Sequence, residues 1–271
     1  MSIGIRARIQ TFARERFPWL YGQLKLLMAA RELTTTGSPW SLNCLEDEAL
    51  RSIIRQSLKN GGTGVDIGAS IGDFAAVMSS ASEDHIHHAF EANPAVADIL
   101  TRRFRRKNVV VHCEALSAES GIANLYVPAT NTGVGGLRVT PSAAKEGQIK
   151  EVSIPVKRLD EYFDNIDQCR IIKLDIEGAE LLALKGARRL ISRDRPVVYF
   201  ECVSHMNIYG YGVEEVYDYF SSLKYELHDP FSYLGGLAPL SKTCFADRVS
   251  SKRNYNFVAV GSAVERDAFP A

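Results

Sequence analysis

The sequence lacks several features that would assign it to a class at once. Its 271 residues contain no run of about 18 apolar residues, so no transmembrane helix is predicted. The five cysteines are odd in number, scattered and without any C-x-x-C pair, which argues against a zinc site and a disulfide framework. The N-terminus lacks the apolar region and cleavage site of a signal peptide. We therefore expect a protein of a reducing compartment, the cytoplasm.

The chain also lacks an excess of charge of either sign. Lysine and arginine together number 32, aspartate and glutamate also number 32, and the formal net charge is zero. Nucleic acid is therefore not expected as the main partner, because phosphate binding needs a basic surface. A hydrophobic fraction of 46% is ordinary for a globular protein with one large core, or a core with a small appendage.

Residues 1–31 depart from this balance, since they carry several basic residues against the single acid Glu15, with apolar residues interleaved. Such a segment can lie on an anionic membrane as a peripheral contact, or serve as a helical lid or a homo-oligomerisation arm. Pro18 and Gly22 interrupt the pattern and favour the lid or arm. We predict an N-terminal helical segment over residues 1–60 and a second domain over residues 61–271.

Strand and helix patterns alternate along the second domain. Strands are predicted at 65–67, 85–90, 109–112, 170–174, 196–202, 225–228 and 255–260, and helices at 46–58, 71–80, 94–106, 179–191 and 213–223. This alternation specifies an α/β fold with a mostly parallel sheet and helices on both faces. Two extra short strands, at 124–127 and 152–156, flank a glycine-rich stretch over 130–147. That stretch is either a substrate lid or an irregular connection.

The most informative segment is Val65-Asp-Ile-Gly-Ala-Ser-Ile-Gly-Asp-Phe74, a strand, a turn and a helix start. Gly68 and Gly72 remove side chains where the turn is tight and a ligand approaches, with Ala69 between them. The G-x-x-x-G spacing differs from the dinucleotide fingerprint and favours a nucleoside ligand without phosphate, such as S-adenosylmethionine. Asp66 can bond the ammonium of that ligand or cap the following helix.

The next two strand ends supply further predicted cofactor contacts. Glu91 follows the turn by about 20 residues, where a carboxylate accepts hydrogen bonds from the ribose hydroxyls. Asn93, directly before Pro94, suits the cap of the next helix, which leaves Glu91 free for a ligand. After the third strand, Ala115 and Leu116 can pack on the adenine.

Acids cluster where the fourth strand ends, in Ile172-Lys-Leu-Asp-Ile-Glu-Gly-Ala-Glu180. Strand periodicity places Lys173, Asp175 and Glu177 on one side of the strand. Burying a charged side chain costs free energy unless it is paired with an opposite charge, so charges here indicate either ion pairs or a functional role. The alternative is a pair between Lys173 and an acid, with capping of the next helix. We expect a functional site, because this strand end adjoins the glycine turn. The fifth strand adds Glu201, with His205 just beyond it.

These motifs together resemble the FkbM-type family of S-adenosylmethionine-dependent methyltransferases. The likeness runs from about Gly64 to Val203 and rests on the glycine turn, on Phe90-Glu-Ala-Asn-Pro94 and on Ile172-Lys-Leu-Asp-Ile-Glu-Gly-Ala-Glu-Leu-Leu-Ala-Leu-Lys-Gly-Ala187. It implies the Rossmann-like class I methyltransferase fold, a seven-stranded sheet whose last strand is inserted antiparallel. It also implies O-methylation of a hydroxyl on a sugar, a glycan or a small natural product.

The chemistry sets what the site residues must do. A sulfonium methyl is already activated, so the enzyme chiefly aligns donor and acceptor, while a hydroxyl needs a general base for its proton. The candidate bases are Asp175 or Glu177, then Glu201 or His205, and Asp175 is also a predicted cofactor contact. No dedicated metal site is predicted, although Asp175, Glu177 and Glu201 can instead hold Mg²⁺. An N-methyltransferase acting on an amine and a non-catalytic binding protein are the alternatives.

Overall fold

The computed structural model describes residues 39–129, 135–162, 164–251 and 255–262. Contacts divide the chain into two units, Met1–Ser52 and Ile53–Ala271. Helix α3 (Pro39–Leu58) begins in the first unit and ends in the second, so the predicted domain boundary after residue 60 falls near its end. The helix starts earlier than the predicted residue 46, and its first residue is a proline, which suits a first turn. The basic N-terminal segment lies outside the described residues.

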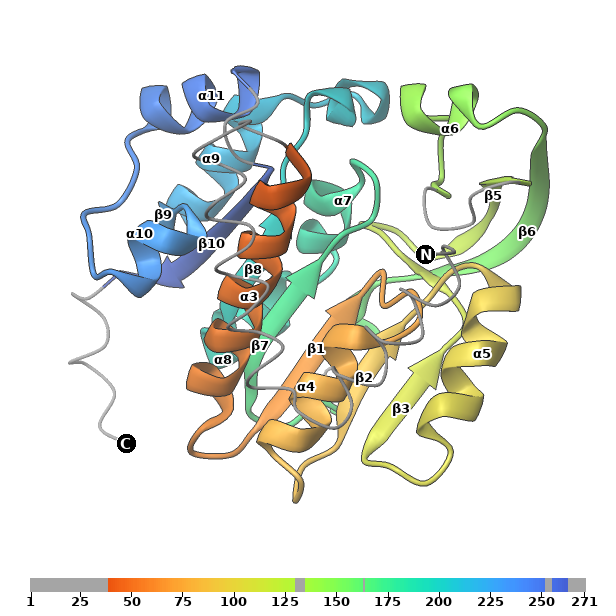
Figure 1. The fold of residues 1–271 in the computed structure, drawn as a ribbon, viewed down its shortest axis with the longest axis horizontal. Helices are drawn as coiled ribbons and strands as arrows, with labels where there is room; N and C mark the ends of the chain where they lie inside the picture. The colour runs from red at the N-terminus through yellow and green to blue at the C-terminus, as the bar shows by residue number, and fades with distance from the viewer. Residues whose placement is uncertain (1–38, 130–134, 163, 252–254, 263–271) are drawn as a thin grey trace, which may run out of the picture. The chain divides into compact units, whose positions relative to one another are not determined.

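The second unit is built on a seven-stranded sheet of order β3-β2-β1-β7-β8-β10-β9 (Figure 1). Its strands are β1 (Thr63–Ile67), β2 (His87–Phe90), β3 (Val109–His112), β7 (Cys169–Leu174), β8 (Val197–Glu201), β9 (Tyr225–His228) and β10 (Asn256–Gly261). The pairs from β3 to β8 are parallel, whereas β10 runs antiparallel between β8 and β9. The predicted mostly parallel α/β sheet, with its last strand inserted antiparallel, is confirmed.

Helices cover both faces of this sheet (Figure 1). One face carries α4 (Asp73–Ala81) and α5 (Pro94–Phe104), and the other carries α7 (Glu180–Lys185), α8 (Arg188–Asp194), α9 (Val213–Ser222) and α11 (Lys242–Ser250). Alternation along each strand divides the core between the faces, so Ala89 packs with α4 and α5 while Phe90 packs with the other set. A short α10 (Pro230–Leu234) follows β9. Among the described residues, no helix has the length and apolarity to cross a membrane.

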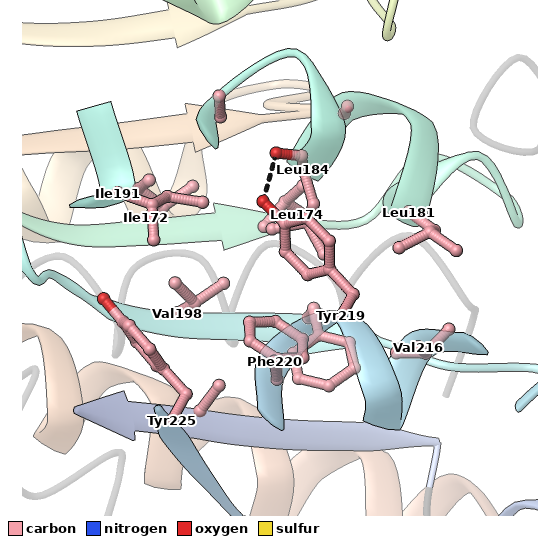
Figure 2. Close-up of a cluster of buried hydrophobic side chains, with 14 of the residues drawn as sticks. Ile172, Leu174, Leu181, Leu184, Ile191, Val198, Val216, Tyr219, Phe220 and Tyr225 are labelled. Carbon is pink, nitrogen blue, oxygen red and sulfur yellow. Dashed lines mark hydrogen bonds between the residues drawn. The ribbon is translucent and has the colours of Figure 1, made fainter. Parts of the chain in front are cut away.

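The larger core lies between the sheet and α7, α8 and α9 (Figure 2). Phe220 of α9 is fully buried, and its ring centroid lies 4.9 Å from that of Phe200 in β8. Tyr219 keeps its hydroxyl satisfied inside the core by donating to the Leu184 carbonyl at 2.5 Å. Each such buried side chain contributes roughly 1.5–3 kcal/mol by leaving water. This core fixes β7 and β8, the two strands that end in acids.

A smaller sheet of order β4-β6-β5 lies between β3 and β7 in the sequence. It contains β4 (Ala115–Leu116), β5 (Gly121–Pro128) and β6 (Ile149–Lys157), with α6 (Pro141–Lys145) between the last two. The two extra strands predicted at 124–127 and 152–156 are therefore present and longer than expected. Gly136 forms a bridge with Tyr126 of β5, so one part of the predicted lid is held at this sheet. Residues 130–134 of the lid lie outside the described residues.

The prediction of a single helix over 179–191 is wrong. The structure has two helices there, α7 and α8, separated by Gly186 and Ala187. Gly186 is where the chain approaches the segment after β4: a Cβ there would lie 2.1 Å from the Ser117 carbonyl oxygen. The carbonyl of Gly186 also accepts a hydrogen bond from the Asp160 N–H at 2.8 Å, in the 3₁₀ turn η2 (Leu159–Tyr162). This close approach, which local periodicity does not reveal, lies at the break between α7 and α8.

Replacing Gly186 with alanine should therefore destabilise the protein by about 2 kcal/mol or more, since the backbone at Ser117 cannot move aside without strain. Urea unfolding measures this as a lower midpoint. Gly121→Ala is the matched control, because a Cβ at Gly121 meets nothing within 4 Å. Equal midpoints for the two variants would contradict the close packing assigned to Gly186.

Candidate functional site

A cavity opens at the carboxyl ends of the central strands. It holds about 950 Å³ of space, counted out to open solvent, and is walled by the ends of β1, β2 and β7, by β4 and β5, and by residues 135–137. The sheet continues from β1 to β2 on one side and to β7 on the other, so the cavity stands at the topological switch point. Six predicted site residues line it: Gly68, Glu91, Ala115, Leu116, Asp175 and Glu177.

A buried ion pair lies directly beneath this edge. Asp66 and Lys173 are register partners on neighbouring strands, which puts their side chains on the same face of the sheet. Lys173 Nζ lies 3.3 Å from Asp66 Oδ1 and donates to the carbonyl of Gly68 at 2.8 Å. Asp66 Oδ2 accepts from the Ala75 N–H at 3.0 Å, in the first turn of α4. The pair therefore joins β7, the glycine turn and the start of the helix.

Burial and partial compensation set the pKa values of this pair. Burial raises the pKa of Asp66, although Lys173 and the Ala75 N–H pull it down. For Lys173, burial lowers the pKa, but the carboxylates of Asp66 and Asp175 outweigh that effect and the net shift is upward. Asp66 is fully buried and does not line the cavity, so the capping alternative describes its position better than ligand contact.

The two glycines of the turn lie in close contact with β7 and α5. Gly68 has φ +74°, and a Cβ there would lie 1.9 Å from the Asp175 carbonyl oxygen, so only glycine lets the ends of β1 and β7 meet. Gly72 serves the core, because its Cβ would clash with Phe104 of α5 at 2.5 Å. Ala69 is buried in the same cluster. Neither Gly72 nor Ala69 lines the cavity, although both were predicted as cofactor contacts.

Glu91, directly after β2, is hydrogen-bonded to the glycine turn and to the segment before α5. Its Oε2 accepts from the Ser70 N–H at 2.8 Å and its Oε1 from the Asn93 N–H at 2.9 Å. Burial raises the pKa of Glu91, and these backbone donors partly offset the shift. Each carboxylate oxygen keeps a further lone pair for a ligand hydroxyl. Asn93 caps α5, as predicted, by accepting from the Ala95 N–H.

A second polar group and an apolar wall complete the β2 side of the cavity. The Nδ2 of Asn93 is buried and has no hydrogen-bond partner among the described residues, so this lining residue can donate to a ligand. Glu114 also lines the cavity and accepts from the Tyr162 hydroxyl. The apolar lining includes Phe90, Val96, Ala115, Leu116 and Leu125.

The acidic turn after β7 is held by buried partners. Glu180 is 4% exposed, and its Oε1 accepts from the N–H groups of Ile176 at 2.9 Å and Gly178 at 3.2 Å. The Tyr211 hydroxyl donates to the carbonyl of Gly178 at 2.5 Å. Within this turn Glu177 has φ +58°, a left-handed conformation that residues other than glycine rarely adopt. Such strain persists only where the surroundings impose it, as they do here.

Burial, and after it the crowding of neighbouring acids, raises the pKa values of the carboxyl groups at this turn. Burial, then the neighbouring Asp175 and Glu180, raises the pKa of Glu177 to about 7. Burial also raises the pKa of Glu180 to about 7. The pKa of Glu201 rises well above its ordinary value through burial and the nearby acids, and its buried Oε2 has no hydrogen-bond partner among the described residues. Asp175, with its side chain 51% exposed, is the solvent-facing member.

The other two predicted catalytic residues differ in how far the structure describes them. Glu201 ends β8 beside the acidic turn but does not line the cavity. His205 falls in the 3₁₀ turn η3 (Ser204–Tyr209), and its side chain lies outside the described part of the chain. Across the described ranges, no three His, Cys, Asp or Glu side chains are grouped so as to hold a metal ion.

Comparison with known families decides the assignment. The family model described as Methyltransferase FkbM domain matches residues 66–227, more than half of the chain. The chain belongs to the FkbM methyltransferase family. Membership implies an S-adenosylmethionine-dependent methyltransferase, and the FkbM domain spans every cavity-lining residue of the glycine turn, β2, β4, β5 and β7. No curated protein matches the chain.

Solved structures similar to this FkbM-family chain include methyltransferases of several kinds. Methyltransferase FkbM from Methylobacillus flagellatus KT is 21% identical with a TM-score of 0.42, and the match covers 73% of this chain and 43% of that one. An rRNA methylase from Streptococcus thermophilus is 11% identical with a TM-score of 0.41, covering 77% and 90%. A TehB-like methyltransferase from Corynebacterium glutamicum is 12% identical with a TM-score of 0.39, covering 78% and 85%. The chain thus spans less than half of the Methylobacillus protein.

The buried pair of this FkbM-family site can be tested directly. Lys173→Met should cost about 3–5 kcal/mol in the free energy of unfolding, because it leaves the Asp66 carboxylate buried without its cation. The double variant Asp66→Asn/Lys173→Met should recover much of that loss, since no buried charge remains. Urea unfolding of the three proteins measures both effects. A single variant within about 1 kcal/mol of the parent would contradict the role assigned to the pair.

Proposed function

We propose that this FkbM-family methyltransferase transfers the methyl group of S-adenosylmethionine to a hydroxyl of a sugar, a glycan or a small natural product. The observation that supports it is a cavity at the switch point. The β2 side of this cavity has hydrogen-bonding and apolar groups suited to a nucleoside, and the end of β7 has carboxyl groups. We also place the reaction in the cytoplasm, which suits five cysteines that are all free thiols.

The residues of the cavity fit the cofactor. Glu91 has lone pairs for the two ribose hydroxyls, and Asn93 Nδ2, which has no hydrogen-bond partner in the described part of the chain, can donate to the same ligand. Ala115, Leu116 and their apolar neighbours form a wall on which a purine can pack. When bound, S-adenosylmethionine supplies a methyl group already activated by its sulfonium.

The chain itself then has to orient the acceptor and take up its proton. Glu177 is the best placed base, because it lines the cavity and its pKa of about 7 balances ionisation against proton affinity at neutral pH. Asp175 lies beside Lys173, whose Nζ is 3.9 Å from Asp175 Oδ2, and its side chain is 51% exposed. We therefore assign Asp175 to cofactor contact and acceptor orientation, and Glu177 to proton removal.

Calorimetric titration tests the cofactor half of this proposal. The folded protein should bind S-adenosylmethionine, and Glu91→Gln should weaken binding by about tenfold or more, because it removes a charged acceptor of the ribose hydroxyls. Asp218→Asn is the matched control, since Asp218 is an exposed acid of α9 paired with Lys242. Folded protein with no detectable binding would refute the proposal.

The base is tested by the pH dependence of turnover, on an acceptor found by incubating extracts with labelled cofactor. A base must be deprotonated to act, so turnover should rise as the pH passes through about 7. Glu177→Gln should lower kcat about 10²-fold or more and remove this dependence. Nearly intact turnover would point to an amine acceptor instead. Loss of turnover on chelation would assign these carboxylates to a divalent cation.

A further inference from the structure

Glu114 lines the cavity on the side of β3, and its carboxyl group is held in place by Tyr162. The side chain of Glu114 is 12% exposed, and its Oε1 accepts a hydrogen bond from the Tyr162 hydroxyl. The same oxygen lies 3.7 Å from Nδ1 of His112. Both contacts go to Oε1, so within the described ranges Oε2 has no hydrogen-bond partner and can accept from a molecule in the cavity.

The ring of Tyr162 belongs to an aromatic cluster that reaches the cavity wall. It meets the rings of Phe90 and His112 edge-on, with centroid distances of 5.3 Å and 4.9 Å. Phe90 and His112 are themselves stacked with centroids 4.3 Å apart, and Phe90 lines the cavity. Stacked and edge-to-face contacts define the relative orientation of such rings. The Tyr162 hydroxyl therefore meets Glu114 from a well-packed support.

The backbone at Tyr162 is anchored as well. Tyr162 is the last residue of η2, and its carbonyl accepts from the Ile166 N–H at 3.0 Å. Asp160 joins the same turn to α8, because its carboxylate accepts from the N–H groups of Arg189 and Leu190, each at 2.9 Å. The position of the tyrosine is thus set by the packing of η2 on α8.

The protonation states of the neighbours suit this contact. Burial, and then the hydrogen bond to Glu114, raises the pKa of Tyr162, so its hydroxyl keeps the proton that it donates. Burial lowers the pKa of His112 to about 4, so its imidazole is neutral at neutral pH and contributes packing. An ionised carboxylate only accepts hydrogen bonds, so the ligand group that meets Oε2 of Glu114 has to be a donor.

We propose that Tyr162 is a positioning residue that holds Glu114 as the acceptor for the amino group of the adenine base. This inference rests on the proposed function, which puts the ribose at Glu91 and the base on the apolar wall that begins at Ala115, the residue after Glu114. The amino-acid end of the cofactor then extends toward β7, and the base amino group is the donor that remains for the β3 side. A base with a carbonyl in that place offers no donor and brings its oxygen against the carboxylate.

Calorimetric titrations with two ligands measure this selection at about pH 7. They are S-adenosylhomocysteine and S-inosylhomocysteine, in which a carbonyl oxygen stands in place of the amino group. The parent protein should bind the adenosyl ligand about tenfold more tightly or better. Glu114→Gln should bring this ratio to about twofold or less, because an amide can donate to the carbonyl as well as accept from the amino group. Tyr162→Phe should lower the ratio about threefold or more, and should not lower it further in the Glu114→Gln background.

Tyr219→Phe is the matched control for Tyr162→Phe. It also removes a buried tyrosine hydroxyl, one that donates to the Leu184 carbonyl in the core. It should therefore lower the melting temperature and leave the ratio of the two affinities unchanged. Thermal melting of each variant shows that the titrated protein is folded.

The outcomes separate the two levels of the argument. Equal binding of the two ligands by the parent, or an unchanged ratio in Glu114→Gln, overturns the inference and leaves the proposed function standing. A ratio that falls in Glu114→Gln but not in Tyr162→Phe overturns the positioning role of the tyrosine. An equal fall in Tyr219→Phe assigns the change to lost stability and overturns that role too. Failure of the folded parent to bind either ligand refutes the proposed function as well.

Discussion

The buried contact between Lys173 and Asp66 is the constraint on which the site depends. The parallel register makes the two residues neighbours, and their remaining hydrogen bonds reach outward to the carbonyl of Gly68 and to the first turn of α4. One ion pair therefore sets how the glycine turn stands against the end of β7. Together with the parallel pairing of β1 and β7, it fixes the positions of the residues that line the cavity from these two strands.

Above that pair, the cavity combines two kinds of wall with different electrostatic character. The β2 side offers hydrogen-bonding groups already fixed by backbone partners, as Glu91 is by Ser70 and Asn93. The β7 side has carboxyl groups whose pKa values are raised to about 7, chiefly by burial and then by neighbouring acids. Fixed acceptors suit recognition of a nucleoside, and carboxyl groups with raised pKa values suit proton transfer.

Much of this arrangement could be predicted from the sequence, because local patterns carry it. The strand ends, the switch point and the lining positions of Gly68, Glu91, Asp175 and Glu177 follow from periodicity and from the order of the elements. The position of Asp66 could not be decided, since a carboxylate before a glycine turn suits either a ligand or a helix cap. Burial beside Lys173 and the bond to the Ala75 N–H favour the cap. Gly72 likewise serves the packing of α5, a contact between distant residues.

Other features depend on contacts that no local pattern reveals, such as the close approach of Gly186 to Ser117. The sequence left open whether the stretch 130–147 is a lid, and residues 135–137 of it line the cavity. The most direct test of the whole account is a crystal structure of the protein with S-adenosylhomocysteine. We expect the ligand in this cavity, with its ribose hydroxyls on Glu91 and its sulfur beside Asp175 and Glu177. A ligand bound elsewhere, or a Glu177 carboxylate turned away into a structural pairing, would contradict it.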